Sequence, residues 1–464
     1  MKAEIGLFGL GVMGKSLSRN LAQKGFRVSL FNRHVEGIEE NIAKDFKYKY
    51  PELEQALPFD DLETFVQSLE VPRKIILMVN AGATVDAVLS SLSKHLEDGD
   101  IVIDGGNSHF EDTNRRIDEL KKQGLNFIGT GVSGGEEGAL RGPSIMPSGE
   151  KEDYLKVKSY LESISAIDAI GGRCCTYIGS EGSGHFVKMV HNGIEYVEMQ
   201  LLAECYSILK KQGLQNEDIA SEFESWMKEL GSYLLGITVD ILRKKEGEKY
   251  VLDQILDKAG NKGTGSWTTV SIANYGAPST LIPAALLSRY LSFFKAFRVD
   301  LAKEYAVKNS SVNIELSDLK NAYKFARIIN HQQGFTLINQ ISEQKGWSVN
   351  LSELARIWTG GCIIKSDLMK ELIEYLKASD NLLTNKNIKL AIEETHAAIK
   401  SVASECILKG IHAPCLVEAV NYFHGVTTSD SSANMIQAQR DYFGAHTYQR
   451  IDDSTEAFYH TKWE

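Results

Sequence analysis

The sequence predicts an α/β domain with a doubly wound parallel sheet, followed by a large all-helical domain and a C-terminal tail. Three observations predict this order. Short apolar runs alternate with helical patterns over residues 1–180, helical periods without strand signals continue over residues 181–440, and residues 441–464 are polar and aromatic without a helical period. We expect these three stretches to be the domains of the chain.

The first domain opens with a strand–helix–strand unit. Ile5–Phe8 reads as a buried strand, Val12–Lys24 as a helix that Gly25 ends, and Phe26–Phe31 as a second strand. Further strands are expected at Lys74–Val79, Asp100–Asp104 and Asn126–Gly129. The alternation of strands and helices predicts a parallel sheet.

The second domain is expected to begin after the small-residue stretch Gly179–Gly184, which can turn the chain into a central helix. Proline is scarce beyond it, as long helices require. The stretch from Lys211 to Trp226 resembles the stretch from Gln344 to Trp358 at a nearly constant offset. This similarity indicates either a duplicated helical unit or chance likeness between amphipathic helices.

Composition excludes several classes of function. The 464 residues carry a formal net charge of −10, which argues against a nucleic-acid partner. Neither a signal-peptide pattern nor an apolar run long enough for a membrane span is present. No metal-ligand spacing appears, and the six cysteines form no CxxC, so a reduced, cytoplasmic protein is expected.

A glycine fingerprint follows the first strand. The GxGxxG at Gly9, Gly11 and Gly14, with Val12 and Met13 between them, opens the first helix. Glycines there permit a tight turn and let a pyrophosphate approach the helix N-terminus. The motif predicts a Rossmann-like dinucleotide site, although a simple glycine-rich turn is the alternative.

The end of the second strand selects the cofactor. Its residues are Asn32, Arg33 and His34, without the carboxylate that usually binds the ribose 2′-hydroxyl of NAD. Arg33 can pair with a 2′-phosphate, so NADP is favoured, with NAD possible. The alternative is that Arg33 is only a surface charge.

Two more loops lie at predicted strand ends, where this type of sheet binds ligands. Asp104–Ser108 contains Asn107, and Gly131–Ala139 contains Ser133, Gly134 and Gly135. Small residues there expose backbone N–H groups that suit a substrate carboxylate. Val79 and Asn80, after the third strand, are expected near the cofactor together with Asn107.

The most informative segment is Val187–Tyr196. In a helix, Lys188, His191, Asn192 and Glu195 fall at i, i+3, i+4 and i+7, on one face. An ammonium, an imidazole, an amide and a carboxylate could then remove a proton from an alcohol and return one to carbon. An ordinary solvated helix face is the alternative.

Taken together, the motifs resemble the 6-phosphogluconate dehydrogenase family, in the β-hydroxyacid dehydrogenase superfamily, in order over essentially the whole chain. The matching segments are Gly6–Gly14, Asn32–Arg33, Asp104–Ser108, Val132–Gly138, Gly142–Pro147, Val187–Tyr196, Lys262–Gly265, Gly360–Ile364 and Arg440–Thr447.

The resemblance implies NADP-dependent oxidative decarboxylation of 6-phospho-D-gluconate to D-ribulose 5-phosphate and CO2, in the pentose phosphate pathway and without a metal. Lys188 resembles the general base, which later acts as an acid on the enediol, and Glu195 resembles the acid that protonates carbon. Asn192, Asn107 and His191 resemble the groups that orient hydroxyls and carboxylate.

The resemblance also implies a homodimer. The phosphate pocket of the family would include Tyr196, Lys262 and Arg289, with Arg440 and His446 contributed by the tail of a partner subunit. The alternative is that Arg440 and His446 are a solvated pair on a disordered tail.

Four positions depart from the family pattern. Ser266 stands where a phosphate-binding lysine is usual, His34 replaces a threonine, Asn80 replaces a lysine, and Gly11 replaces a common alanine, which restores the standard fingerprint. The first three differences leave open a related dehydrogenase that acts on another sugar acid or prefers NAD. A catalytically silent sugar-phosphate-binding dimer is a further alternative, which the intact Lys188/Asn192/Glu195 set argues against.

Overall fold

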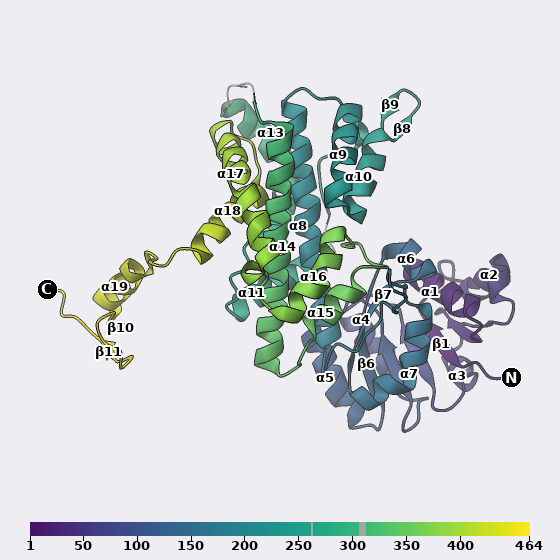
Figure 1. Ribbon diagram of the computed structural model, residues 1–464. Helices are drawn as coiled ribbons and strands as arrows, with labels where there is room; N and C mark the ends of the chain where they lie inside the picture. Colours follow the sequence, from purple (N-terminus) through teal and green to yellow (C-terminus); the bar gives the residue numbers. More distant parts are fainter. Residues whose placement is uncertain (261–262, 306–311) are drawn as a thin grey trace.

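The computed structural model describes residues 1–260, 263–305 and 312–464. It confirms the predicted fold class: a Rossmann-like sheet domain is followed by a tall helical domain, and the C-terminal segment projects away from both (Figure 1). Among the helices that the structure describes, none combines the length and apolar character needed to cross a membrane.

The sheet of the first domain has seven strands in the order β3-β2-β1-β4-β5-β6-β7. Strands β1 to β6 are parallel, which confirms the predicted parallel sheet, whereas β7, which the sequence did not predict, is antiparallel to β6. The connection between them holds only helix α6 (Gly135–Arg141), while a parallel crossover needs about a dozen residues or more. The strands are β1 (Ile5–Phe8), β2 (Val28–Phe31), β3 (Leu57–Phe59), β4 (Lys74–Leu77), β5 (Ile101–Asp104), β6 (Asn126–Ser133) and β7 (Ser144–Gly149).

Helices cover the two faces of this sheet (Figure 1). The predicted first helix ends one residue early, because Lys24 is its C-cap and Gly25 takes the left-handed conformation with φ of 90°. The sequence missed strand β3 and strand β7, which lack a long apolar run. The helices are α1 (Val12–Gln23), α2 (Ile42–Lys49), α3 (Leu62–Gln67), α4 (Ala83–Leu92), α5 (Phe110–Lys121), α6 and α7 (Lys151–Ile164).

Two long helices, α8 (Ser183–Lys211) and α14 (Leu316–Lys345), form the centre of the second domain and pack against each other. The prediction that strands are absent over residues 181–440 is wrong for one small hairpin, β8–β9 (Lys245–Glu246, Lys249–Tyr250). A second hairpin, β10–β11 (Tyr448–Gln449, Phe458–Tyr459), lies in the tail, where no strand was predicted. Strands of two residues are too short to leave an alternating pattern. The other helices are α9 (Asn216–Leu230), α10 (Tyr233–Arg243), α11 (Thr264–Asn274), α12 (Leu281–Phe293), α13 (Lys295–Glu304), α15 (Leu351–Ile357), α16 (Asp367–Ala378), α17 (Lys386–Leu408), α18 (Pro414–Val426) and α19 (Ala433–Gly444).

The two similar stretches of sequence have the same local arrangement. Each follows one of the long helices, passes through a glycine with positive φ, Gly213 or Gly346, and leads into the next helix. Trp226 and Trp358 are both fully buried at the far ends. Duplication of a helical unit stays a prediction that this arrangement favours.

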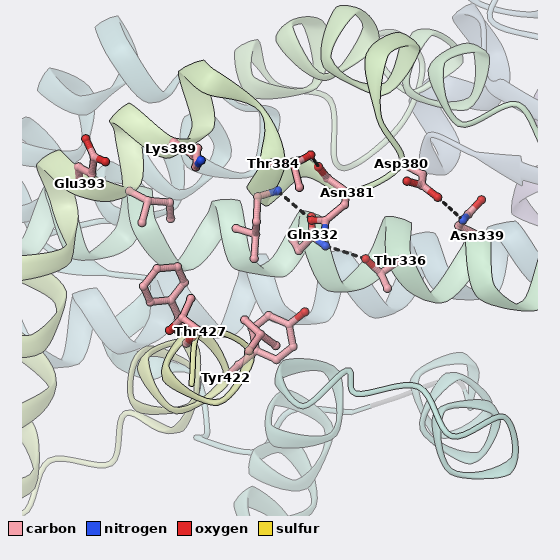
Figure 2. A pocket seen from close by; sticks show the side chains of 14 residues that line it. Gln332, Thr336, Asn339, Asp380, Asn381, Thr384, Lys389, Glu393, Tyr422 and Thr427 are labelled. Atoms are coloured by element: carbon pink, nitrogen blue, oxygen red, sulfur yellow. Dashed lines mark hydrogen bonds between the residues drawn. The ribbon is translucent and has the colours of Figure 1, made fainter. Parts of the chain in front are cut away.

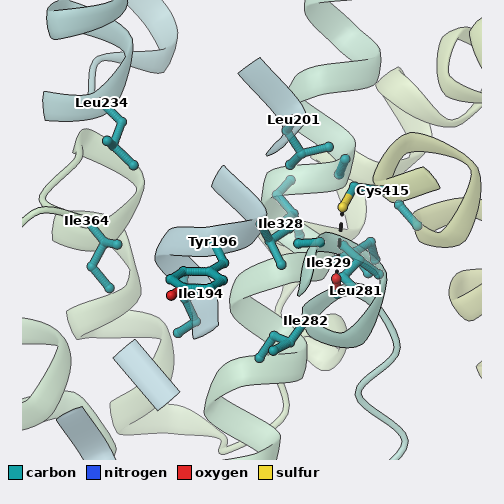
Figure 3. Close-up of a cluster of buried hydrophobic side chains, with 14 of the residues drawn as sticks. Ile194, Tyr196, Leu201, Leu234, Leu281, Ile282, Ile328, Ile329, Ile364 and Cys415 are labelled. Carbon is teal, nitrogen blue, oxygen red and sulfur yellow. Dashed lines mark hydrogen bonds between the residues drawn. The ribbon is translucent and has the colours of Figure 1, made fainter. Parts of the chain in front are cut away.

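The core of the helical domain is a large apolar cluster to which α8 contributes Ile194 and Tyr196, α12 contributes Ile282 and α14 contributes Ile328 (Figure 3). Helix α14 approaches α8 closely at Gly334. A Cβ added at Gly334 would lie 2.4 Å from Ile194 Cδ1.

A buried ion pair joins the same two helices. Arg327 Nε donates to Glu198 Oε2 at 3.0 Å, and both side chains are at most 3% exposed. The hydroxyl of Tyr323 and the amide of Asn330 also donate to this carboxylate. Because Glu198 is the acidic partner that Arg327 contacts directly, losing its charge would leave the buried Arg327 without an ion pair.

The C-terminal segment folds around one carboxylate. Asp441, which is fully buried, accepts hydrogen bonds from the backbone N–H groups of Thr447 and Thr461 and from the indole of Trp463. The expected loss of helical structure at Asp441 is wrong by about one turn, because α19 runs on to Gly444. The tail is therefore ordered by its own contacts.

Removal of the Glu198 charge should destabilise the protein. We expect Glu198→Gln to lower the free energy of unfolding by about 3 kcal/mol or more, because Arg327 would stay buried and unpaired. Glu217→Gln is the matched control, since Glu217 pairs with Arg243 on the surface and such pairs contribute about 1 kcal/mol or less. Urea unfolding followed by circular dichroism measures both; equal effects would contradict the assignment.

Candidate active site

The glycine fingerprint forms a tight turn that only glycine permits. Gly9 has φ of 99°, and a Cβ there would lie 2.6 Å from the carbonyl oxygen of Met78. A Cβ at Gly14 would lie 1.9 Å from the carbonyl oxygen of Gly9. Gly11 is the N-cap of α1, faces open space and supplies no side-chain cap to the first turn, at Val12 and Met13. These backbone groups fit the pyrophosphate of a dinucleotide.

The end of β2 differs from the sequence prediction. Asn32, Arg33 and His34 lie there as expected, but a carboxylate lies with them. Arg33 Nη2 donates to Glu39 Oε1 at 2.9 Å, and Asn32 Nδ2 donates to Glu39 Oε2 at 2.9 Å. The prediction that no carboxylate lies at the end of β2 is wrong, because a turn brings Glu39 back to Asn32 and Arg33.

The loop after β5 lies against the end of β4. Asp104 holds it, since its carboxylate accepts from Gly106 N–H and Ser108 Oγ. A Cβ at Gly106 would lie 3.1 Å from the carbonyl oxygen of Val79. Val79, exposed Asn80 and exposed Asn107 therefore share the carboxyl edge of two neighbouring strands, beside the fingerprint.

Helix α8 crosses the sheet at close range. A Cβ at Gly131, in β6, would lie 2.5 Å from Lys188 Cβ, and a Cβ at Gly184 would lie 2.1 Å from the carbonyl oxygen of Met146. These two glycines let α8 lie directly on β6 and β7. Lys188 is thereby only 7% exposed, at the edge where β6 ends in Ser133.

The predicted face of α8 is a connected polar cluster. Lys188 Nζ donates to Asn192 Oδ1 at 2.6 Å and lies 3.4 Å from His191 Nδ1. The other ring nitrogen of His191 lies 3.2 Å from Ser133 Oγ. Glu195 lies one turn further on, with Oε2 4.0 Å from His191 Nδ1. An ordinary solvated face is excluded, because Lys188, His191 and Asn192 are all buried.

Burial shifts each titratable group of the cluster towards its neutral form. It lowers the pKa of Lys188, although the Glu195 charge opposes this shift. Burial and the neighbouring Lys188 hold the pKa of His191 well below its usual value. Burial also raises the pKa of Glu195, against the charges of Lys188 and Arg289. Such matched shifts are characteristic of groups that exchange protons near neutral pH.

A second group of side chains lies beyond Glu195. The guanidinium of Arg289, on α12, stacks over the ring of Tyr196 with its Cζ 3.5 Å from the centroid. A Cβ at Gly265, on α11, would lie 2.6 Å from the same ring, so half-buried Ser266 is next to this contact in the chain. The structure thus brings Arg289 and Tyr196 to the Glu195 side of the cluster.

Other predicted residues are not brought together. Arg440 and His446 are exposed on the projecting C-terminal segment, away from α8 of the same chain (Figure 1). Lys262 lies outside the described residues. Gly134 and Gly135, both with positive φ, begin α6 directly after Ser133.

The side chains that pack behind His191 were not predicted from the sequence. The ring of Trp358 contacts the imidazole edge-to-face, with centroids 5.3 Å apart. A Cβ at Gly134 would lie 2.6 Å from the carbonyl oxygen of Gly361, so the loop after α15 packs on the Ser133 loop. The segment Gly360–Ile364, which resembles the family, was the signal in the sequence that could have indicated this packing.

A separate pocket of about 580 Å³ lies between α14, α17 and α18, lined by residues such as Gln332, Asp380, Lys389 and Tyr422 (Figure 2). It contains none of the residues of the polar cluster. Within residues 1–260, 263–305 and 312–464, no three His, Cys, Asp or Glu side chains gather closely enough to hold a metal ion.

Comparison with known proteins places these features in context. Residues 4–179 match the family model of the NAD binding domain of 6-phosphogluconate dehydrogenase, and residues 184–463 match its C-terminal domain. The chain is 45% identical over 475 residues to the NADP(+)-dependent, decarboxylating 6-phosphogluconate dehydrogenase of Bacillus subtilis, covering 100% of this chain and 99% of that protein. It is 44% identical over 472 residues to the NAD(+)-dependent one of the same organism, covering 99% of each.

A solved structure is similar over the same length. The 6-phosphogluconate dehydrogenase of Plasmodium falciparum, described in its apo form and with NADP+ and 6-phosphogluconate, superposes with a TM-score of 0.93 at 38% identity. The alignment covers 99% of this chain and 100% of that one.

The electrostatics of the cluster can be tested through Glu195. We expect its pKa to lie above the ordinary value and to rise further in Arg289→Met, because the Arg289 charge favours the carboxylate. The difference in proton binding between each protein and its Glu195→Gln variant, measured by potentiometric titration, reports this pKa. Arg243→Met, which removes a distant surface cation, should leave it unchanged; a fall in Arg289→Met would contradict the contact.

Proposed function

This chain belongs to the 6-phosphogluconate dehydrogenase family, and we propose on that basis that it oxidises and decarboxylates 6-phospho-D-gluconate to D-ribulose 5-phosphate and CO2 with NADP+. The observation that carries the proposal is the cluster of buried Lys188, His191 and Asn192 with half-buried Glu195, beside a dinucleotide-type fingerprint. A silent sugar-phosphate-binding protein would have no use for two proton-transfer groups with opposed pKa shifts.

The first proposed step is oxidation at carbon 3 of the sugar acid. A bound NADP+ supplies the nicotinamide that accepts a hydride. Lys188 acts as the base that removes the hydroxyl proton, which requires a neutral amine. Burial lowers its pKa and so favours that form, and the 2.6 Å hydrogen bond to Asn192 fixes the position of Nζ.

The second step is loss of CO2 from the resulting β-keto acid. The ketone oxygen accepts the electrons of the breaking C–C bond, and the Lys188 ammonium formed in the first step stabilises that oxygen. Glu195 then protonates the carbon left behind. Its raised pKa keeps a proton available at a pH where an ordinary glutamate is ionised. Asn107 and His191 would orient the hydroxyl and carboxylate groups.

We propose that the substrate phosphate lies beyond Glu195. Arg289, stacked on Tyr196, is a cation on this side of Glu195 that could meet it. Ser133, with the backbone of Gly134 and Gly135, would take the carboxylate end. Lys262, Arg440 and His446 remain proposals by resemblance to the family.

A homodimer is proposed from the surface of the chain. Its accessible surface is 22495 Å², whereas a compact monomer of 51.5 kDa should expose about 17,000 Å². Large apolar side chains are exposed on α12, α13 and the tail, including Phe294, Phe297, Phe443 and Phe458. A second copy that covers them could bring Arg440 and His446 to Arg289. A cytoplasmic location is proposed because all six cysteines are free thiols.

Lys188→Ala tests the base. We expect kcat with 6-phosphogluconate to fall by about 10³-fold or more, since general-base catalysis contributes about 10² to 10⁴. Nicotinamide absorbance measures the rate, and calorimetry with NADP+ should show unchanged cofactor binding. Lys158→Ala, at an exposed lysine of α7, is the control and should retain full activity. Substantial turnover by Lys188→Ala would remove Lys188 from the mechanism.

Ser266→Lys tests the phosphate site. If 6-phosphogluconate is the substrate, the added cation should lower its KM by roughly tenfold, in line with a charge-assisted hydrogen bond, and leave kcat similar. The KM for NADP+ is the internal control, and unphosphorylated gluconate should gain nothing. A gain for gluconate, or a loss for the phosphorylated acid, would point to a different sugar acid.

A further inference from the structure

Glu39 lies where a cofactor-selecting acid would be needed. Its carboxylate accepts from Arg33 Nη2 at 2.9 Å, Arg33 Nε at 3.3 Å and Asn32 Nδ2 at 2.9 Å. The oxygen of the same Asn32 amide accepts from Leu10 N–H, in the fingerprint, at 3.2 Å. One amide therefore links Glu39 to the loop that would hold the pyrophosphate.

A turn built into the chain sets this position. Val35 and Glu39 exchange two backbone hydrogen bonds, of 2.9 and 2.8 Å, and Gly37 takes φ of 72° between them. The Glu40 carboxylate accepts from Gly37 N–H and ties down the tip. The turn folds Glu39 back to the end of β2, although Glu39 follows Arg33 by six residues in the chain.

The ion pair with Glu39 compensates the charge of Arg33 but leaves its side chain accessible to a ligand. The Arg33 side chain is 71% exposed and that of Glu39 is 31% exposed, so a ligand can reach both. Hydrogen bonds from Arg33 hold the pKa of Glu39 below its usual value, so the carboxylate is charged at neutral pH. A 2′-phosphate approaching Arg33 meets this negative charge, whereas a 2′-hydroxyl meets a hydrogen-bond acceptor.

We propose that Glu39 is the residue of this chain that admits NAD: it accepts the adenosine ribose hydroxyls of NAD and competes with the 2′-phosphate of NADP for Arg33. The inference rests on the proposed function, because it takes the fingerprint as a nicotinamide-dinucleotide site. The Nε–Nη2 edge of Arg33, the edge that faces a phosphate bidentately, is already engaged by Glu39. To bind NADP, Arg33 must release this edge or use another one beside a carboxylate.

Binding of nucleotide fragments tests the proposal without turnover. Calorimetry with 2′,5′-ADP and with 5′-AMP compares ligands that differ only at the 2′ position. Glu39→Gln should tighten 2′,5′-ADP by about tenfold, the size expected for removing one charge beside a phosphate near the surface, and should weaken 5′-AMP, which loses a charged acceptor for its ribose hydroxyls. The ratio of kcat/KM for NADP+ to that for NAD+ should rise in parallel.

Glu36→Gln is the matched control. Glu36 lies on the same turn, is exposed and carries the same charge, so it reports the general effect of net charge. It should change the binding of both fragments less than twofold. Equal effects of the two substitutions, or weaker binding of 2′,5′-ADP by Glu39→Gln, would overturn the proposal; the latter would make Glu39 a residue that positions Arg33 for the phosphate.

The role of Glu39 and the proposed substrate can be rejected separately. Discrimination by Glu39→Gln without turnover of 6-phosphogluconate by the wild type would uphold the role of Glu39 and reject the proposed substrate. Turnover without discrimination would reject the role of Glu39 alone. Failure of the wild type to bind either fragment would reject the dinucleotide site and this inference together.

Discussion

The close packing of α8 against the sheet is the constraint on which the candidate site depends. It requires backbone without side chains at Gly131 and Gly184, where a Cβ would meet Lys188 or Met146. This approach excludes water from Lys188 and places it beside Ser133, at the carboxyl edge of the sheet. If α8 lay further from the sheet by the width of a side chain, the same residues would face solvent and would have ordinary pKa values.

Helix α8 shows two ways to bury charge within three turns. Glu198 is fully compensated by Arg327, which suits a fixed, stabilising link to α14. Lys188 is hydrogen-bonded to the neutral Asn192, and burial disfavours its charge in spite of Glu195. Burial likewise disfavours the charge of Glu195, in spite of Lys188 and Arg289. The first arrangement resists a change in protonation, whereas the second makes that change easy, as proton transfer requires.

The sequence predicted the elements that carry a period or a motif. Ile5–Phe8, the fingerprint and the polar face of α8 were predicted because spacing alone defines them. The contact of Trp358 with His191 was missed because distant parts of the chain create it, and the two-residue hairpins were missed because such short strands leave no alternating pattern. Glu39 was missed because a local turn, and not a regular spacing, brings it to Arg33. The spacing of the site residues suggests their chemical roles, and measurements of ligand binding must test those roles.

The C-terminal segment explains how a site could be completed by a second chain at little entropic cost. Asp441 gathers Thr447, Thr461 and Trp463 around one carboxylate, so the fold of the segment exists before any partner covers it. Ordering a flexible tail on binding would oppose association, while a preformed one loses little freedom. In the proposed dimer, Arg440 would therefore arrive on an ordered helix, and the exposed Phe443 and Phe458 would supply the apolar area that drives association.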